Sequence, residues 1–230
     1  MFFGKKKAIT FSYDDGVTQD VRLIEILDKY GLKATFNLNS ELFGLDGTLI
    51  REGKNINHNK ILPEMVASVY KNHEIAVHTL THPRLTELSD EEVIRQVEED
   101  RKNLSAIAGY EVIGMAYPCG GVNNDDRVAE VIKRNTGVKY SRTITLEDSF
   151  AEQKNLYRFN PTAFHLNFEK NYRLAEELFK PETEGLLYIW GHAYEFDIND
   201  TWSEFEEFCK FISGRDDVFY GTNREVLLKN

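Results

Sequence analysis

Residues 8–16 read Ala-Ile-Thr-Phe-Ser-Tyr-Asp-Asp-Gly, an apolar-rich run that ends in two acids and a glycine. Ile9, Phe11 and Tyr13 alternate with other residues, which is the period-2 pattern of a β-strand. Residues 18–30 then carry apolar residues at helical spacing, and Gly31 ends that pattern. A strand, a polar turn and a helix in this order form the repeating unit of an α/β fold.

The same alternation continues through the chain. Further strands are expected at residues 33–38, 74–77, 112–117, 138–143, 186–190 and 218–220, and further helices at 63–71, 89–108, 125–135, 168–179, 203–212 and from 223 onward. Ser89 and Glu92 fit a capping box at the start of the clearest helix. Strands that alternate with helices predict a parallel sheet covered by helices. Seven or eight such units predict a closed or partly closed barrel.

Length and composition restrict the class of protein. No linker or repeat divides the 230 residues, so we expect one domain over residues 1–230. Lys and Arg number 28 against 38 Asp and Glu, and the net charge of −10 disfavours nucleic acid and acidic membranes as partners. Neither a signal sequence nor an 18-residue apolar run is visible, which predicts a cytoplasmic protein. Two cysteines are too few for a disulfide framework. The oligomeric state cannot be predicted.

Polar clusters follow four of the expected strands. They are Asp14-Asp15-Gly16, His78-Thr-Leu-Thr-His82-Pro83, Tyr117-Pro-Cys-Gly-Gly121 and Gly191-His192. The carboxyl ends of parallel barrel strands lie on one face, where active sites are built. The clusters are therefore expected to meet there. Residues 43–59, rich in Gly and Asn, are interpreted as loop decoration over this face in preference to a lid.

The spacing of His78 and His82 allows both imidazoles to bind one ion across a helical turn or a tight loop. This spacing alone is a weak signal. A carboxylate from Asp14-Asp15 would complete three protein ligands and leave positions for water, the layout of a catalytic zinc site. One acid would bind the ion, and the other would take a proton from water whose pKa the metal lowers to ~7. Adjacent acids in a loop are more often solvated or capping.

His192 ends an apolar strand on the same predicted face. A protonated imidazole there can donate to a leaving nitrogen as general acid. The alternative is a core histidine bonded to a carbonyl.

In order along the chain, these motifs resemble those of the polysaccharide deacetylase (NodB-homology, carbohydrate esterase family 4) superfamily. The matching residues are Phe11-Ser-Tyr-Asp-Asp-Gly16, His78-Thr-Leu-Thr-His82-Pro83, Ala116-Tyr-Pro-Cys-Gly120 and Trp190-Gly-His192. The resemblance implies an α/β fold, a distorted (β/α) barrel of about seven parallel strands. It implies one divalent ion, with Zn²⁺ the usual metal, and hydrolysis of N-acetyl groups on N-acetylglucosamine-type sugars. It also implies a role for each site residue: Asp15, His78 and His82 as ligands, Asp14 as base and His192 as acid.

The chain departs from the family pattern at three points. Ala116 stands where the third motif normally has an Arg that tethers the base, and Cys119 stands where an aromatic residue is usual. The Asp-rich fourth motif is not visible. We hypothesise that Arg142, at the end of a later strand, replaces the missing Arg as partner of Asp14.

Several further residues are candidates for substrate binding. Aromatic rings next to the expected mouth can stack on a sugar, although packing is their commoner role. Glu195 and Asp197 are expected either to bond substrate hydroxyls or to orient His192. The aromatic candidates are Tyr117, Trp190 and Tyr194; His165 is a further candidate, whereas His58 and His73 are interpreted as surface residues.

The sequence therefore predicts a metal-dependent hydrolase of non-peptide C–N bonds that removes an N-acetyl or other acyl group from an amino sugar or related amide. In this prediction the Tyr117 backbone N–H helps the ion to polarise the oxyanion. Three alternatives stay open. Two His and one carboxylate also form the Fe(II) site of oxygenases. The changes at Ala116 and Cys119 allow a carbohydrate-binding homologue without turnover. The amide need not belong to a sugar.

Overall fold

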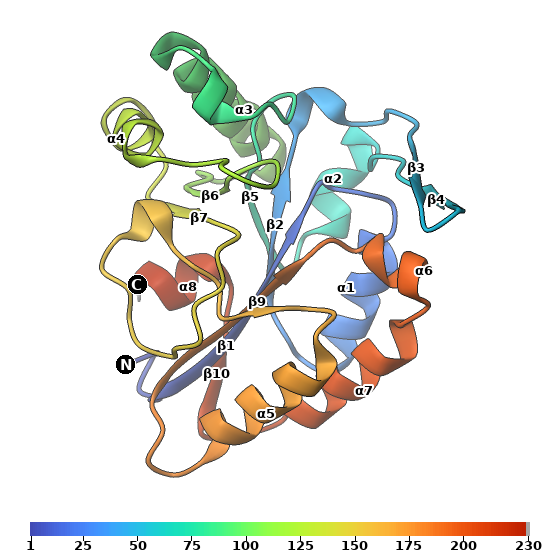
Figure 1. Cartoon of the computed structure of the whole chain (residues 1–230), viewed down its shortest axis with the longest axis vertical. Helices are drawn as coiled ribbons and strands as arrows, with labels where there is room; N and C mark the ends of the chain where they lie inside the picture. Colours follow the sequence, from blue (N-terminus) through green and yellow to red (C-terminus); the bar gives the residue numbers. More distant parts are fainter. Residues whose placement is uncertain (229–230) are drawn as a thin grey trace.

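A curled parallel sheet forms the centre of the protein, as seen in the computed structural model, which describes residues 1–228 (Figure 1). The sheet has eight strands, in the order β7-β6-β5-β2-β1-β9-β8, with β10 also paired to β1. Its strands are β1 (Lys7–Asp14), β2 (Ala34–Leu38), β5 (Glu74–Val77), β6 (Gly114–Ala116), β7 (Tyr140–Arg142), β8 (Ala163–Phe164), β9 (Gly185–Gly191) and β10 (Val218–Tyr220). All their ladders are parallel, which confirms the predicted distorted (β/α) barrel.

Strand β1 is the central strand, and all of its residues are buried. One side pairs with β9 along almost its full length, from Lys7 to Tyr13. On the other side β10 pairs with residues 7–9 and β2 with residues 11–14. The strand is thus enclosed on both sides, and its carboxyl end lies between the ends of β2 and β9.

Helices cover the outside of the sheet. They are α1 (Asp20–Lys29), α2 (Pro63–Val69), α3 (Asp90–Ala108), α4 (Asp126–Asn135), α5 (Phe168–Phe179), α6 (Glu195–Asn199), α7 (Trp202–Ile212) and α8 (Asn223–Leu228). Figure 1 shows α1, α5 and α7 on one flank and α3 and α4 beyond the β5–β6–β7 edge. The expected cap of α3 is present in part, because Ser89 Oγ accepts from Glu92 N at 3.3 Å while the Glu92 carboxylate turns to Arg95. No helix within residues 1–228 is both long and apolar enough to cross a bilayer.

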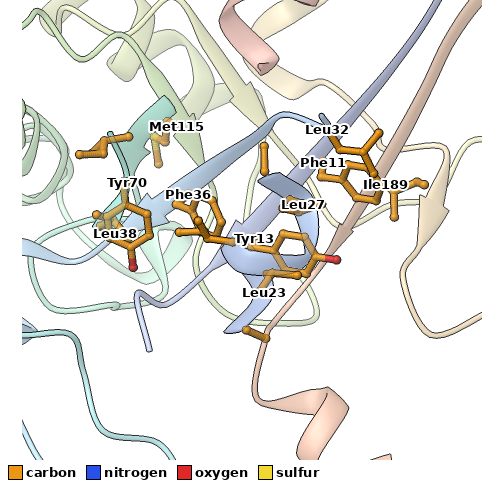
Figure 2. Close-up of a cluster of buried hydrophobic side chains, with 14 of the residues drawn as sticks. Phe11, Tyr13, Leu23, Leu27, Leu32, Phe36, Leu38, Tyr70, Met115 and Ile189 are labelled. Atoms are coloured by element: carbon orange, nitrogen blue, oxygen red, sulfur yellow. The ribbon is translucent and has the colours of Figure 1, made fainter. Parts of the chain in front are cut away.

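The two faces of β1 have different chemistry. Phe11 and Tyr13 enter the apolar core with Leu23 and Leu27 of α1, part of which is drawn in Figure 2. Because side chains alternate along a strand, Thr10, Ser12 and Asp14 point to the opposite face. That face is polar: Thr10 binds Asn223 at 3.0 Å, and Ser12 accepts from Asn37 at 2.9 Å. Asp14 therefore ends a row of hydrogen-bonded groups inside the barrel.

Residues 43–59 contain more regular structure than a decorating loop. They form an antiparallel hairpin of β3 (Thr48–Arg51) and β4 (Lys54–Asn57), which projects beside α6 at the upper right of Figure 1. The predictions also did not include the two-residue β8 or the short α6. Each of these elements lies at or near the carboxyl edge of the sheet.

Candidate metal and acid–base centre

The four sequence clusters meet at the carboxyl ends of the strands. Asp14 is the last residue of β1 and Asp15 follows it, while His78 comes directly after β5. Arg142 ends β7, and His192 follows β9. The sheet thus brings together residues from widely separated parts of the chain, as the parallel topology predicts.

Asp15, His78 and His82 form a candidate metal centre. Asp15 Oδ1 lies 3.8 Å from His78 Nε2 and 3.4 Å from His82 Nε2, and the ligand atoms of all three lie within 4.8 Å of one another. His78 Nδ1 is 2.9 Å from the Ala116 carbonyl, an acceptor, so the Nδ1–H donates there and the Nε2 lone pair faces Asp15. Two imidazole nitrogens and one carboxylate oxygen are a ligand set that suits zinc.

Both histidines are held in the neutral form that binds metal. Burial lowers the pKa of His78 to about 4, and the opposing charge of Asp14 does not compensate. Burial also lowers the pKa of His82, against the charge of Asp15. Burial of Asp15 would raise its pKa, but the His58 hydrogen bond and the charges of Lys60 and His192 hold the value well below the ordinary one. The carboxylate and both imidazoles therefore have the protonation states that a metal requires.

The backbone around this centre is left-handed at four residues other than glycine. Asp15 has φ 82°, Thr79 φ 70°, His82 φ 61° and Cys119 φ 70°. Such residues cost about 1–3 kcal/mol each and persist only where the surroundings fix them. His82 and Thr79 are fixed by a bond from His82 N to Thr79 Oγ1 at 3.1 Å. The two histidines converge because they lie in this tight loop and not on a helical turn.

Asp14 is buried beside the metal centre and is paired with Arg142. The Arg142 guanidinium contacts both carboxylate oxygens, and Asn37 Nδ2 donates to Oδ1 at 2.8 Å. Burial alone would raise the pKa of Asp14, but the charge of Arg142, with smaller effects of His78 and His192, holds it below the usual value. Asp14 is therefore an ionised carboxylate in a site almost closed to water.

The register explains how Arg142 reaches Asp14. Ala116 on β6 and Arg142 on β7 are direct partners in the parallel ladder. The family pattern has its Arg at position 116, so the side chain in this protein comes from one strand further along the sheet. The guanidinium also lies 4.6 Å from the centre of the Trp190 ring and donates to Ser12 Oγ at 3.1 Å. The expected contact between Arg142 and Asp14 is thus present.

His192 lies opposite Asp14 and is held by Glu195. The Nδ1 of His192 is 3.1 Å from Glu195 Oε2, and its Nε2 lies 4.0 Å from Asp14 Oδ2. Burial would lower the pKa of His192, but the hydrogen bond and charge of Glu195, together with Asp15 and Asp14, raise it to about 9. His192 is therefore an imidazolium at neutral pH, with Nε2–H directed at the site.

Two expected substrate contacts are wrong. His165 does not face the mouth: its side chain is fully buried, 4.5 Å from the Phe196 ring, and its Nε2 is 2.8 Å from Glu195 Oε2. Tyr117 is 1% exposed, its hydroxyl donates to Tyr157 O at 2.8 Å, and its backbone N–H donates to Arg142 O at 3.0 Å. Tyr117 thus offers neither a ring face to a sugar nor a free N–H to an oxyanion.

The remaining aromatic candidates lie at the site. Trp190 is half-buried, but the Arg142 guanidinium covers one face of its ring. Tyr194 lies 5.2 Å from the His192 ring and 4.9 Å from the His58 ring. Of the two expected roles of Glu195, the contacts match the orientation of His192. Asp197 instead accepts from Trp202 Nε1 at 2.8 Å.

The interpretation of His58 and His73 as surface residues is wrong. His73 is 7% exposed, and its Nδ1 accepts from Ala34 N at 3.2 Å at the opposite end of β2. The Nε2 of His58 lies 3.4 Å from Asp15 Oδ2, because the hairpin returns past the metal centre. Lys60, which the sequence does not mark as a site residue, also contacts this loop, with its Nζ 2.8 Å from Asp15 O. No motif signals these two contacts, since they depend on where the hairpin docks.

A known protein family has a sequence pattern that matches the part of the chain that contains most of this site. The model of the polysaccharide deacetylase family matches residues 4–140, more than half of the 230 residues. The chain belongs to the polysaccharide deacetylase family. The predicted family is thereby confirmed. Asp14, Asp15, His78 and His82 all lie inside the matched range, whereas Arg142 and His192 lie outside it.

A relative and two solved structures illustrate the similarity. Residues of the chain are 30% identical to the peptidoglycan-N-acetylmuramic acid deacetylase PdaC of Bacillus subtilis over 125 residues, which is 53% of this chain and only 23% of PdaC. A family 4 carbohydrate esterase from Streptomyces lividans shares the fold, with TM-score 0.56, 10% identity and 95% and 93% of the two chains covered. A carbohydrate esterase family 4 pseudoenzyme from Bacillus anthracis has TM-score 0.55 and 17% identity, with 96% and 66% covered. The fold alone thus does not establish turnover.

Proposed function

We propose that this polysaccharide deacetylase family member is a metal-dependent hydrolase that removes the N-acetyl group from an amino sugar. The observation that carries this proposal is the convergence of a ligand triad, Asp15, His78 and His82, with an ionised carboxylate and an imidazolium. Asp14 is the ionised carboxylate and His192 the imidazolium. Amide hydrolysis needs all three functions, because water must be activated, the oxyanion stabilised and the leaving nitrogen protonated.

The residues divide this work between them. A divalent ion, for which we propose Zn²⁺, would supply Lewis-acid polarisation of the acyl oxygen and a water molecule of lowered pKa. Asp14 accepts the proton of the attacking water, and Arg142 keeps this carboxylate ionised and fixed. His192 donates Nε2–H to the leaving nitrogen, while Glu195 holds the opposite nitrogen. The 4.0 Å between His192 Nε2 and Asp14 Oδ2 supports the proposal that acid and base act on one reacting centre.

The proposed leaving group and the relatives support the choice of substrate class. The named relatives act on N-acetylmuramic acid or N-acetylglucosamine residues of peptidoglycan. We therefore propose an N-acetylated amino sugar, with peptidoglycan-type fragments as the first substrates to test. Tyr194 lies beside His192, and we propose it as the aromatic residue that contacts the sugar ring.

A binding protein without turnover is the second candidate, favoured by Ala116 and Cys119. The Arg142 contact weakens this reading, because the base retains its guanidinium partner despite Ala116. Cys119 Sγ lies 3.7 Å from His82 Nδ1, so the sulfur atom contacts the ring nitrogen of His82 that does not face Asp15. Neither change removes a member of the proposed machinery.

Acetate release tests the proposal directly. Metal-replete protein is incubated with N-acetylated sugars, chitin-type oligomers and peptidoglycan fragments, alongside chelator-treated protein and the Asp14→Asn variant. We expect acetate from at least one substrate, lost in both controls. Saturable sugar binding with no acetate from metal-loaded protein would favour the binding homologue.

A further inference from the structure

The segment that leaves the β3–β4 hairpin is paired with the loop that carries Asp15. Val17 and Lys60 form an antiparallel bridge outside the main sheet. Thr18 N donates to Asn59 O at 2.9 Å, and Ile61 N donates to Gly16 O at 2.9 Å. Backbone bonds on both sides of the bridge therefore fix the position of residues 58–61 against the Asp15 loop.

Two side chains of this segment contact Asp15. His58 Nε2 lies 3.4 Å from Oδ2, and Lys60 Nζ lies 2.8 Å from the backbone oxygen and 3.8 Å from Oδ1. An ionised carboxylate oxygen only accepts hydrogen bonds, so His58 must carry its hydrogen on Nε2 in this contact. The two carboxylate oxygens are thereby separated: Oδ2 accepts from His58, whereas Oδ1 faces His78 and His82.

Asp15 needs support from neighbouring segments because its own backbone conformation is energetically unfavourable. Its φ of 82° is left-handed, and Asp15 precedes Gly16, whose φ is 61°. A residue in this region persists only when its surroundings fix it. Lys60 holds its carbonyl, His58 its carboxylate, and Asn37 O accepts from its N–H at 3.1 Å. Two of these three supports come from the segment that follows the hairpin.

The hairpin is itself attached to the element that supports His192. Lys54 Nζ donates to Ile198 O of α6 at 2.7 Å, and the His58 ring packs edge-on against Tyr194 at 4.9 Å. Gln19 Nε2 bridges Asn57 O at 2.7 Å and Asp197 Oδ2 at 2.9 Å. These contacts attach the hairpin to α6, and the His58 ring contacts both Asp15 and Tyr194.

We infer that residues 58–61, which follow the hairpin, support the metal centre. In this inference His58 is a positioning residue that directs Oδ1 of Asp15 to the metal. The inference rests on the proposed function, since it assumes that Asp15, His78 and His82 bind a divalent ion. Metal-binding carboxylates are normally hydrogen-bonded by such outer partners, whose loss costs roughly 10- to 100-fold in metal affinity. The residues that bind the ion are unchanged by mutation of His58, so affinity isolates the positioning effect.

The test is metal affinity, measured by competition with a chromophoric chelator for Zn²⁺ and by the visible spectrum of the Co²⁺-substituted protein. The variants are His58→Ala, His58→Gln and, as a matched control, Ile50→Ala in strand β3 of the hairpin, where the residue is 69% exposed. Gln extends an amide N–H to a place close to that of Nε2 and keeps a donor. Circular dichroism and urea unfolding confirm that each variant is folded.

We expect His58→Ala to bind Zn²⁺ roughly 10- to 100-fold more weakly, with an altered Co²⁺ spectrum. His58→Gln should recover most of the affinity, and Ile50→Ala should match the wild type. Equal affinities of His58→Ala and wild type would overturn the inference, and so would a His58→Gln variant as weak as His58→Ala. If His58→Ala does not fold, His58→Leu keeps the packing without a donor and is judged by the same criteria. A wild-type protein that binds no metal would instead overturn the proposed function.

Discussion

Asp14 and Asp15 are adjacent in sequence and both buried, yet different parts of the molecule support them. Asp14 belongs to β1 and is held from inside the barrel by Arg142 of β7 and Asn37 of β2. Asp15 lies beyond the strand in a left-handed turn and is held from outside by His58 and Lys60. One peptide bond therefore divides an acid–base half, held by groups inside the sheet, from a metal half, whose Asp15 is supported by the segment that follows the β3–β4 hairpin.

This difference shows how one short motif supplies two functions. Along an extended strand the side chain after Asp14 would point to the opposite face. The left-handed turn at Asp15 instead swings its carboxylate toward His78 and His82 while Asp14 stays inside the barrel. The two acids then face one reacting centre from different sides, each with its own counter-charges.

The largest expected effects come from replacing Asp14 and Asp15 with their amides, which should separate the loss of turnover from the loss of metal. Asp14→Asn should retain the metal and lose turnover by roughly 10²–10⁴-fold, the range typical of a lost general base. Asp15→Asn should lose metal affinity first, and turnover with it. Metal content and acetate release, measured on the same samples, check this. Loss of metal in Asp14→Asn would show that the two halves are not separable.

Removal of Arg142 should be the next largest effect, and it acts on stability as well. The Arg142 side chain is 1% exposed, so Arg142→Ala leaves the Asp14 carboxylate buried and unpaired. Breaking such a pair costs about 3–5 kcal/mol of the free energy of unfolding. Without the guanidinium the pKa of Asp14 rises, so the acid limb of the activity profile should move to higher pH. Urea unfolding and a pH–rate profile measure the two effects.

The register offers a control for this variant. Ala116 lies directly beside Arg142 in the ladder, so Ala116→Arg in the Arg142→Ala background places a guanidinium one strand nearer. Compared with Arg142→Ala alone, we expect the free energy of unfolding to recover in part and the acid limb of the activity profile to move back toward lower pH. No recovery would mean that the position of Arg142, and not merely its charge near Asp14, is required.

The acid–base half was largely predictable from the sequence, and the metal half only in its ligands. The strand that carries Asp14 follows from a period-2 pattern, and the strands before Arg142 and His192 follow from short runs that alternate with helical patterns. Parallel topology then brings the ends of these strands together. Asp15, His78 and His82 were marked by spacing and by the family resemblance. Their convergence depends on left-handed backbone at Asp15 and His82, which no glycine signals.

The supports of the metal half were missed because they arise from tertiary docking. His58 and Lys60 follow a hairpin whose strands are mostly exposed and polar, so no periodic pattern marks it. Their partner is set by the bridge between Val17 and Lys60, a pairing with no local sequence signal.

Burial of His165 beneath Glu195 was missed for the same reason. Gly191 allows that approach, since a Cβ there would lie 2.2 Å from the His165 ring.

The carboxylate of Glu195 should set the basic limb of the activity profile. His192 must be protonated to act as acid, and its raised pKa of about 9 places the loss of activity on the alkaline side. Glu195→Gln keeps the shape and an acceptor for Nδ1 but removes the negative charge. The pKa of His192 should then fall by roughly 1 unit or more, and the basic limb should move to lower pH. A pH–rate profile in metal-loaded protein measures this, and an unmoved limb would exclude His192 as the group that titrates.

The smallest expected effect concerns a third acid, Asp20, the buried first residue of α1. Burial raises its pKa to about 8, helped by the charges of Asp15 and Asp14, although the Tyr70 hydroxyl donates to it at 2.7 Å. Its unfolded pKa is about 3.9. Between these values the folded protein binds more protons than the unfolded chain, so this group's stabilisation is complete below pH ~4 and is lost as the pH rises toward 8. Asp20→Asn stays neutral throughout, so its stability should decline less, by up to about 1 kcal/mol per pH unit. Urea unfolding of metal-free wild type and variant at pH 5.5 and pH 7.5 measures the difference; parallel declines in the two proteins would show that Asp20 is ionised in the folded state.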